Sequence, residues 1–382
     1  MNYKTKNRTD KSNWIENLMS FNSVKELKIN LFKGYSGFTS LPKKIIIIGA
    51  SPLISELIDG LLEKNTIIEG VFDQDINKIG KFFKGRRVCS LEEIGNMEPD
   101  IPVLIGTHRT RNLYKYLKPL NFQYVWPFPL FSFYDNDQFK PHPFYKGIIE
   151  DLFENRDQIK WLYKNLSDEK SKHVLNAIVG FRLTYNPEIL DELIDPFPYF
   201  PKDIIRLCNK EVLVDGGAFN GDSIRLFKEI TSDKFKCIIP FEPSPSVFKL
   251  LKETFYQDKR IIPTNACLFN KKTTLLFDST KGRASAVSSS NGNICQALNI
   301  DCLNNADDIT FIKLNIEGAE SDALSGAERT LKEKQPKIAV AVYHRPDHLW
   351  YLAKQIRKIN PNYTLHLRQH DGGIIETVLY AI

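Results

Sequence analysis

The chain has 382 residues, enough for two or three domains with separate hydrophobic cores. Its composition, 42% hydrophobic and 26% charged, is that of an ordinary globular protein. The net charge of +6 is small and lies partly in the N-terminal tail, without the concentrated basic stripe of a nucleic-acid-binding protein. We therefore expect no nucleic-acid partner.

Targeting segments and metal motifs are not recognisable. The chain begins without a secretory segment, and no apolar run is long enough to span a bilayer, so we expect a cytoplasmic protein with no integral membrane segment. The six cysteines are scattered, with no C-x-x-C pair and no His/Cys ligand spacing. Several lie in apolar runs, which predicts reduced core thiols and no metal site.

The first third of the chain predicts a helix and then a small α/β domain. Residues 1–40 read as a polar tail and a helix, with apolar residues at helical spacing from Trp14 to Phe32. We expect this apolar face to pack on the following domain; a partner interface is the alternative. Residues 41–134 contain the buried-strand run KKIIIIG, a helix from Pro52, and further strands at 66–72, 101–105 and 124–126. This βαβαβ pattern predicts a Rossmann-like parallel sheet.

The loop after the first of these strands leaves two interpretations open. One is a nucleotide or sugar-nucleotide site at Gly49 to Ser51, with Asp73 contacting a hydroxyl. The other, which we favour, is a degenerate accessory domain for binding or assembly, such as a homo-oligomer, because only the first glycine of G-x-G-x-x-G is kept. The same missing glycines weigh against a third hypothesis, a nucleotide-dependent oxidoreductase built on this domain.

Residues 135–201 predict a helical connector. The segment begins with a run rich in proline and aromatic residues, continues with helices over 148–166 and 169–185, and ends in a second such run at Pro201. The connector is interpreted either as one wall of a substrate cleft or as plain inter-domain packing.

Residues 202–382 predict the domain that carries the chemistry. EVLVDGGAFNGDS reads as a buried strand, a glycine-rich turn, and a helix that opens at Asp222 and Ser223. A second strand ends in Glu242, twenty-one residues after Gly221. That spacing suits a carboxylate that accepts hydrogen bonds from both hydroxyls of a ribose. Together these features predict a nucleoside-containing cofactor.

Polar residues follow the later strands as well. Strands are expected at 310–315 and 337–342, helices at about 321–334 and 349–359, and a final hairpin closes the sheet. Because the carboxyl ends of strands in a doubly wound sheet line one crevice, their polar residues should converge. Glu317 or His344 can then take a proton from an acceptor. The loop 281–293 is interpreted either as a catalytic lid or as a plain surface loop. The residues at these ends are Asp215, Glu242, Asn265, Lys313, Asn315, Glu317 and His344.

Six motifs in this half, VDGGAFNGDS, FEPSP, NACLF, FIKLNIEGAE, VAVYH and ETVLYAI, resemble in order the FkbM-type S-adenosylmethionine-dependent methyltransferases. The resemblance covers about Phe200 to Ile382. It implies a seven-stranded Rossmann-like class I methyltransferase sheet with an antiparallel last strand. It also implies methyl transfer from S-adenosylmethionine to an oxygen of a sugar, polysaccharide precursor or related metabolite. The whole chain is then α/β, with a smaller N-terminal Rossmann-like domain and a helical connector.

The resemblance also implies roles for individual residues. Lys313, Asn315, Glu317 and His344 would face the transferred methyl and a small-molecule or glycan acceptor. The chain departs from the family at Asn315, where the family usually has aspartate; asparagine orients a hydroxyl but cannot take its proton. This departure keeps open a second hypothesis, a binding protein that has lost catalysis. The cofactor-binding residues implied are Asp215, Gly217, Asn220, Gly221, Asp222, Ser223, Glu242, Pro243, Ser244, Ala266 and Cys267.

Overall fold

The computed structural model describes residues 13–35, 37–278, 286–288, 293–304 and 306–382. The chain divides into two compact units. The N-terminal unit comprises residues 1–160, 173–194 and 371–375, and the C-terminal unit comprises residues 161–172, 195–370 and 376–382. The helical segment 135–201 is divided between these units. Within the described ranges, no helix has the length and apolar character needed to cross a membrane.

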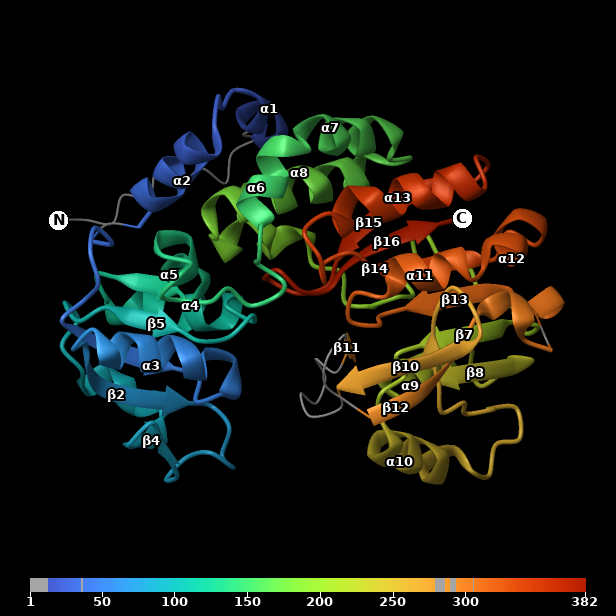
Figure 1. Ribbon diagram of the computed structural model, residues 1–382, viewed down its shortest axis with the longest axis horizontal. Helices are drawn as coiled ribbons and strands as arrows, with labels where there is room; N and C mark the ends of the chain where they lie inside the picture. Colours follow the sequence, from blue (N-terminus) through green and yellow to red (C-terminus); the bar gives the residue numbers. More distant parts are fainter. Residues whose placement is uncertain (1–12, 36, 279–285, 289–292, 305) are drawn as a thin grey trace. The chain divides into compact units, whose positions relative to one another are not determined.

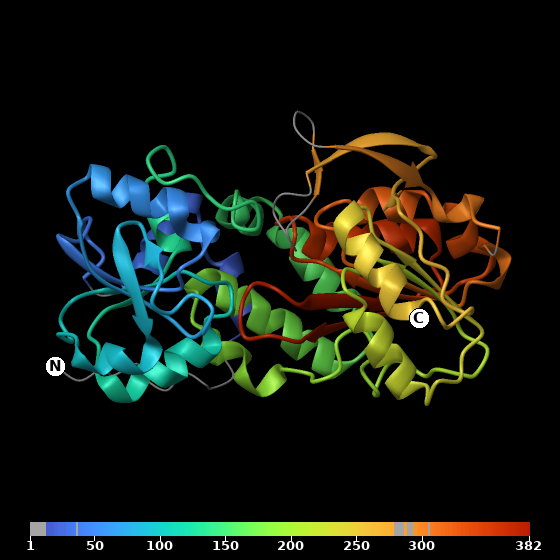
Figure 2. The same cartoon turned by 90° about the horizontal axis from the view of Figure 1, so that it is seen from below.

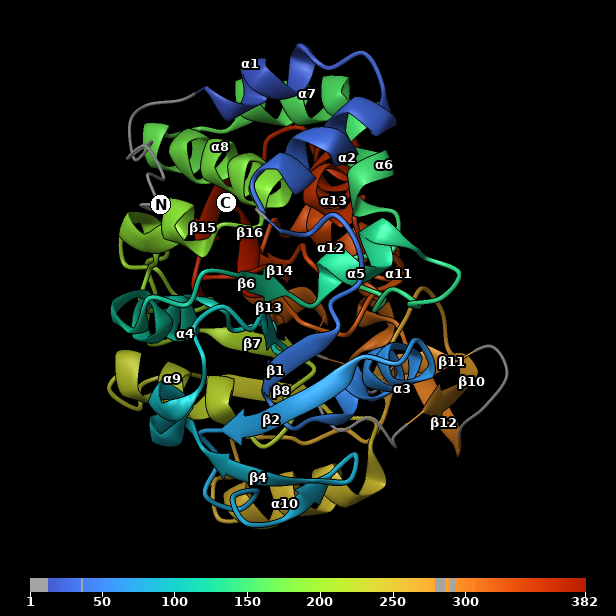
Figure 3. The same ribbon diagram turned by 90° about the vertical axis from the view of Figure 1, so that its left-hand side faces the viewer.

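The N-terminal unit is built on a six-stranded sheet in the order β3-β4-β2-β1-β5-β6. Only β3 runs antiparallel to its neighbour. Figure 3 shows β1, β2 and β4 of this sheet in blue. The strands are β1 (Lys44–Ile48), β2 (Ile67–Asp73), β3 (Phe82–Phe83), β4 (Arg86–Ser90), β5 (Val103–Ile105) and β6 (Val125–Pro127). The predicted parallel strands are confirmed.

The hairpin β3–β4 is absent from the sequence prediction. Its turn is Lys84-Gly85, and both residues have positive φ, 48° and 76°. Two-residue hairpins favour such left-handed pairs because their twist matches that of the strands. A lysine is an uncommon choice for the first position, so the sequence indicates the turn only weakly.

Helices precede, connect and follow these strands, and the last two, Arg156–Asn165 and Glu169–Thr184, have residues in both units. The predicted helix at 14–32 is broken into two, because Asn13 and Ser23 each accept a backbone N–H and start a new helix. α2 buries Leu27 and Leu31 and contacts α6. The helices are α1 (Trp14–Met19), α2 (Val24–Lys33), α3 (Ser55–Glu63), α4 (Arg111–Leu117), α5 (Pro129–Tyr134), α6 (Ile148–Glu154), α7 (Arg156–Asn165) and α8 (Glu169–Thr184).

The C-terminal unit has a central sheet in the order β15-β16-β14-β13-β7-β8. Figure 1 shows its strands β16, β14, β13, β7 and β8 one after another. β7, β8, β13 and β14 are parallel, and β16 is antiparallel to both of its neighbours. The strands are β7 (Val212–Gly216), β8 (Cys237–Phe241), β13 (Phe311–Leu314), β14 (Lys337–Ala341), β15 (Leu365–Gln369) and β16 (Thr377–Ala381).

The predicted α/β class and antiparallel last strand are confirmed, but the sheet has six strands instead of seven. Residues 261–264 lie beside β8, where a further strand is expected. They make only isolated parallel bridges, Ile238 with Ile261 and Phe241 with Thr264. On the β8 side, the N–H groups of Ile238 and Glu242 donate to the carbonyl oxygens of Arg260 and Thr264, but Pro240 between them has no N–H, so the ladder is interrupted there.

A smaller four-stranded sheet has the order β11-β10-β12-β9 and stands apart from the central sheet (Figure 2). Most of the loop interpreted as a lid lies outside the described residues; 286–288 belong to β11, and residue 293 begins β12. The strands are β9 (Cys267–Leu268), β10 (Thr273–Asp278), β11 (Ala286–Ser288) and β12 (Asn293–Leu298).

The predicted helix over 321–334 is two short helices that meet at Gly326. A Cβ at Gly326 would lie 2.1 Å from the Phe269 carbonyl oxygen, so only glycine permits this approach.

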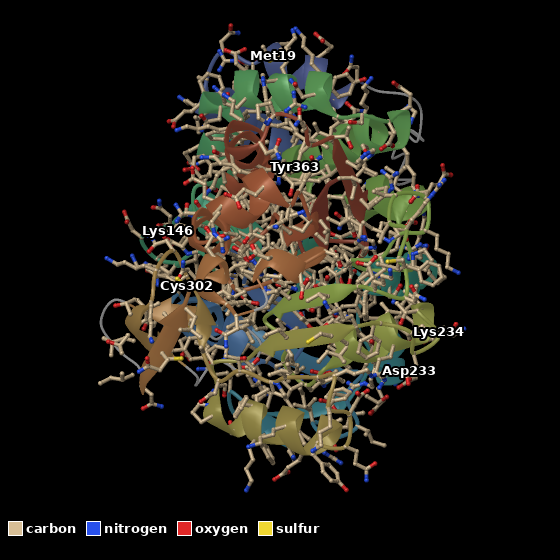
Figure 4. All side chains as sticks on the ribbon, turned by 90° about the vertical axis from the view of Figure 1, so that its right-hand side faces the viewer. Met19, Lys146, Asp233, Lys234, Cys302 and Tyr363 are labelled. Atoms are coloured by element: carbon tan, nitrogen blue, oxygen red, sulfur yellow. The ribbon has the colours of Figure 1, made fainter. Side chains whose placement is uncertain are left out.

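Tyr363 is fully buried and donates to the Pro336 carbonyl oxygen at 2.8 Å (Figure 4). The helices of this unit are α9 (Asp222–Ile230), α10 (Pro245–Phe255), α11 (Glu320–Ser325), α12 (Glu328–Glu333) and α13 (His348–Ile359).

The cysteines follow the prediction only in part. Cys237, Cys267 and Cys295 are buried, as predicted for core thiols, whereas Cys208 and Cys302 are exposed. Figure 4 labels Cys302. The six thiols are free. In the parts of the chain that the structure describes, no three His, Cys, Asp or Glu side chains are placed to share a metal ion.

Candidate active site

The candidate site lies at the carboxyl edge of the central sheet. β7 is the first strand of this sheet in the chain, and β8 and β13 lie on its two sides. The strand order therefore reverses between β7 and β13, which is where an open α/β sheet binds its ligand. Most of the polar residues singled out in the sequence lie at the ends of β7, β8, β13 and β14 or directly after them, and Asn265 follows the stretch 261–264 beside β8.

The glycine-rich turn after β7 is pressed against the end of β13. Gly217 has a φ of 75°, and a Cβ there would lie 2.0 Å from the Asn315 carbonyl oxygen. Gly221 has a φ of 82°, and its Cβ would meet the Phe255 ring at 2.4 Å. Both positions therefore require glycine. The two glycines therefore let the Asn315 carbonyl group and the Phe255 ring pack directly against the turn.

A buried ion pair holds this turn in place. Asp215 and Lys313 lie 2.8 Å apart, with side-chain exposures of 0% and 3%. The Lys313 ammonium also donates to the carbonyl oxygens of Gly216 and Gly217, at 3.0 and 2.9 Å. Ser223 donates to the other oxygen of Asp215 at 2.5 Å. These contacts tie both charged groups to the protein and fix the turn.

Glu242 joins the ends of β7 and β8. Its carboxylate accepts the Phe219 N–H at 3.0 Å and the Ser244 N–H at 2.8 Å, one on each oxygen. Because a carboxylate has about four lone-pair sites, two remain for a diol. Burial raises the pKa of Glu242 above its ordinary value, although these two N–H donors oppose the shift. Asn265 steadies the segment by donating to the Glu242 and Pro243 carbonyl oxygens, at 2.8 and 3.2 Å.

The remaining predicted cofactor residues lie around this turn and at the start of β9. Asn220 is half-buried, and its carbonyl oxygen accepts from Arg225 at 2.9 Å. Asp222 is exposed and accepts the Ser223 N–H at 2.8 Å. Ala266 and Cys267 are buried, and the Cys267 thiol donates to the Cys295 sulfur at 3.6 Å. None of these contacts assigns a ligand role, which for these residues stays a prediction.

Asn315 lies between two tyrosines. Its amide nitrogen donates to the Tyr199 hydroxyl at 2.6 Å, and its oxygen accepts from the Tyr343 hydroxyl at 3.4 Å. Burial raises the pKa of both phenols well above the ordinary value, so both are neutral at physiological pH. Sequence reasoning missed Tyr199 as a site residue, because it belongs to an aperiodic run of proline and aromatic residues.

The segment after Asn315 and the segment after β14 together form a buried group of carboxylates and imidazoles. Glu320 contacts Nδ1 of His344 at 2.7 Å and Nδ1 of His348 at 3.3 Å. It also accepts the N–H groups of Ile316 and Gly318, at 2.8 and 3.0 Å. Glu317 lies 3.5 Å from His344 Nε2. Glu320 therefore shapes the loop that presents Glu317.

His344 is protonated in this group. Burial by itself would lower its pKa, but the carboxylates of Glu320 and Glu317 outweigh burial and raise the pKa to about 10. Burial likewise opposes ionisation of Glu320, yet the two imidazoles hold its pKa far below the ordinary range. A histidine that already carries a proton at neutral pH is a poor base, whereas Glu317 remains a candidate.

Several non-glycine residues at this edge have left-handed backbone. Phe219, Glu317, Tyr199 and Glu376 have φ of 46°, 56°, 67° and 64°. Such conformations cost about 1–3 kcal/mol each and persist where the surroundings enforce them, often at functional sites. Their presence beside the strand ends supports this edge as the site.

In the N-terminal unit, the residues of the predicted nucleotide site contact one another. Asp73 accepts the Ala50 N–H at 2.8 Å and the Asp75 N–H at 2.9 Å, and pairs with Lys78 at 3.0 Å. These contacts close the loops after β1 and β2. A sugar-nucleotide ligand here stays a prediction.

Comparison with known proteins identifies the C-terminal part of the chain. Residues 215–367 match the family model described as the methyltransferase FkbM domain. No curated protein matches the chain. Among solved structures, it is similar to the methyltransferase FkbM from Methylobacillus flagellatus KT, at 21% identity and a TM-score of 0.71, over 97% of this chain and 97% of that chain.

Two further solved structures are less similar. Fibrillarin from Aeropyrum pernix, in complex with S-adenosyl-L-methionine, is 13% identical with a TM-score of 0.31, over 47% of this chain and 71% of that chain. Precorrin-6y C5,15-methyltransferase from Geobacter metallireducens GS-15 is also 13% identical with a TM-score of 0.31, over 50% and 94%. The family match covers the glycine-rich turn, Glu242 and Asn315, so the part of this chain that holds the candidate site, residues 215–367, is similar to the methyltransferase FkbM domain.

Proposed function

We propose that the chain is an S-adenosylmethionine-dependent O-methyltransferase whose acceptor is a hydroxyl of a sugar, polysaccharide precursor or related metabolite. The observation that carries the proposal is the arrangement of Glu242 and Glu317 at one sheet edge. Glu242, after β8, has free lone pairs beside a turn that only glycine can form. Glu317 comes after β13, which lies on the other side of β7.

The cofactor side of the site fits a nucleoside. The two remaining lone pairs on Glu242 match the two ribose hydroxyls. When bound, S-adenosylmethionine would supply an electrophilic methyl group, whose bond to sulfur breaks with the electron pair left on sulfur as the acceptor oxygen bonds to carbon.

The acceptor side fits a neutral hydroxyl. Tyr199 and Tyr343 are neutral, and Glu317 is the nearest carboxylate to His344 Nε2. Glu376 acts on both phenols electrostatically. Carboxylates repel phosphate or carboxylate acceptors and accept hydrogen bonds from hydroxyls. The neutral phenols and the carboxylates together support an uncharged, hydroxyl-rich acceptor.

In this proposal Glu317 takes the hydroxyl proton, because Asn315 cannot and His344 already carries one. Glu317→Gln is expected to lower kcat about 100-fold, since a positioned base contributes at least that much. The measurement is incubation with S-adenosylmethionine and a set of neutral methyl glycosides, with the methylated product quantified by mass spectrometry. Glu229→Gln, a change at an exposed carboxylate near the end of α9 with no assigned role, serves as the matched control.

The outcomes separate the hypotheses. Methylation by the wild type that Glu317→Gln slows while affinity for S-adenosylhomocysteine is kept supports the proposal. Cofactor binding without methylation of any acceptor supports a binding protein on a methyltransferase fold. A Glu317→Gln variant as fast as the wild type removes Glu317 from the proton transfer.

A further inference from the structure

Tyr199 is a buried hydroxyl that the sequence motifs do not explain. Its side chain lies with the Lys313 ammonium 5.1 Å from the ring centroid. Its backbone is left-handed, with φ of 67°, and its N–H contacts Tyr380 of β16. A strained residue needs such support, since the conformation costs about 1–3 kcal/mol. The fold thus holds this phenol in place beside Asn315.

The hydrogen bonds at Asn315 leave the proton of the Tyr199 hydroxyl unused. The Asn315 amide nitrogen is the donor to Tyr199, so the Tyr199 oxygen acts as acceptor in that contact and keeps its own proton. The Asn315 oxygen is occupied by the Tyr343 hydroxyl. Over the ranges of the chain that are described, the Tyr199 hydroxyl donates to no protein group.

We propose that the Tyr199 hydroxyl donates this proton in a hydrogen bond to the oxygen of the acceptor hydroxyl and so orients it for methylation. The inference rests on the proposed function and adds a specificity-determining residue to it. With one lone pair of the acceptor oxygen held by Tyr199 and its proton held by Glu317, the second lone pair is left to form the new bond to carbon. Orientation of this kind lowers a barrier by positioning.

The asparagine at 315 is what makes the Tyr199 proton available. An ionised aspartate has only acceptor atoms, so it would accept from both Tyr199 and Tyr343. Tyr199 would then donate its proton to residue 315 and could offer only lone pairs to the acceptor. The departure of this chain from the family pattern is thus read as a change in acceptor recognition.

The test is a double-mutant cycle with Tyr199→Phe and Asn315→Asp, measured with the methyl glycoside that the wild type methylates best. Each single variant is expected to lower kcat/KM about tenfold, the value of one neutral hydrogen bond, with unchanged affinity for S-adenosylhomocysteine. The double variant is expected to be no slower than the slower single variant, because both changes remove the same hydrogen bond. Tyr363→Phe is the matched control, since it removes another buried phenol hydroxyl, which donates to the Pro336 carbonyl oxygen and does not contact Asn315.

Two results would overturn the proposal: a Tyr199→Phe variant within about twofold of the wild type, or losses that multiply in the double variant. A second measurement does not need the acceptor. In protein labelled with 13C at tyrosine Cζ, the resonance lost in Tyr199→Phe is that of Tyr199, and it should shift in Asn315→Asp as the phenol turns from acceptor to donor.

The two proposals can fail separately. If the wild type binds S-adenosylhomocysteine but methylates no glycoside, the carbohydrate acceptor fails. The Tyr199 proposal is then decided by the labelled spectrum: a Tyr199 resonance that shifts in Asn315→Asp supports it, and one that does not move overturns it.

Discussion

Glu242→Ala is expected to weaken S-adenosylhomocysteine binding about 100- to 1,000-fold, the loss of two hydrogen bonds to a charged acceptor. The variant also leaves the Phe219 and Ser244 N–H groups without their acceptor, so the turn that borders the ligand loosens. Calorimetric titration measures the affinity, and a thermal melt shows whether the variant is folded.

Glu242→Gln is the matched control, because it keeps the shape and one acceptor oxygen. Its affinity should fall between those of the wild type and Glu242→Ala. Since burial raises the pKa of Glu242, the affinity of the wild type should begin to fall on acidification at a higher pH than an ordinary glutamate predicts. A Glu242→Ala variant within about threefold of the wild type would place the ribose elsewhere.

Glu320→Ala is expected to lower the free energy of unfolding by about 3–5 kcal/mol, because it leaves the charged His344 buried without its closest partner. The change also removes the acceptor of the Ile316 and Gly318 N–H groups. Urea unfolding followed by circular dichroism measures the loss. Asp322→Ala, on the same helix, is the comparison for general effects on α11.

The same group predicts a pH dependence. The pKa of His344 is raised from 6.5 to about 10 in the folded chain, so its stabilising contribution is complete below pH 6.5 and is lost as pH rises toward 10. The pKa of Glu320 is lowered from 4.5, so its contribution is present above that value and is lost on acidification. The wild type should therefore lose stability between pH 7 and 10, and Glu320→Gln should reduce that slope. An equal slope in both proteins would mean that His344 is not charged.

The sequence predicted which polar residues lie at the strand ends. Asp215, Glu242 and Asn315 each follow an apolar run, and the strand order brings those ends to one edge. Contacts between distant segments were not predictable: Tyr199 reaches Asn315 across 116 residues. The ion pair of Asp215 was also hard to foresee, because its partner Lys313 comes from a strand that is distant in the sequence.

Some features of the fold were hidden for local reasons. Pro240 interrupts the ladder between β8 and residues 261–264, so the sheet has six strands where the family resemblance implied seven. Gly326 divides one predicted helix because a carbonyl lies against it. Neither effect follows from periodicity, since each depends on a neighbour that only the folded chain supplies.

The most direct test of the account is calorimetric titration of S-adenosylhomocysteine into the wild-type protein. We expect saturable binding at one site per chain, with Glu242→Ala reducing the affinity as described. Absence of binding at millimolar ligand, in protein shown to be folded by its thermal melt, would contradict the assignment of the glycine-rich turn and Glu242 as a cofactor site.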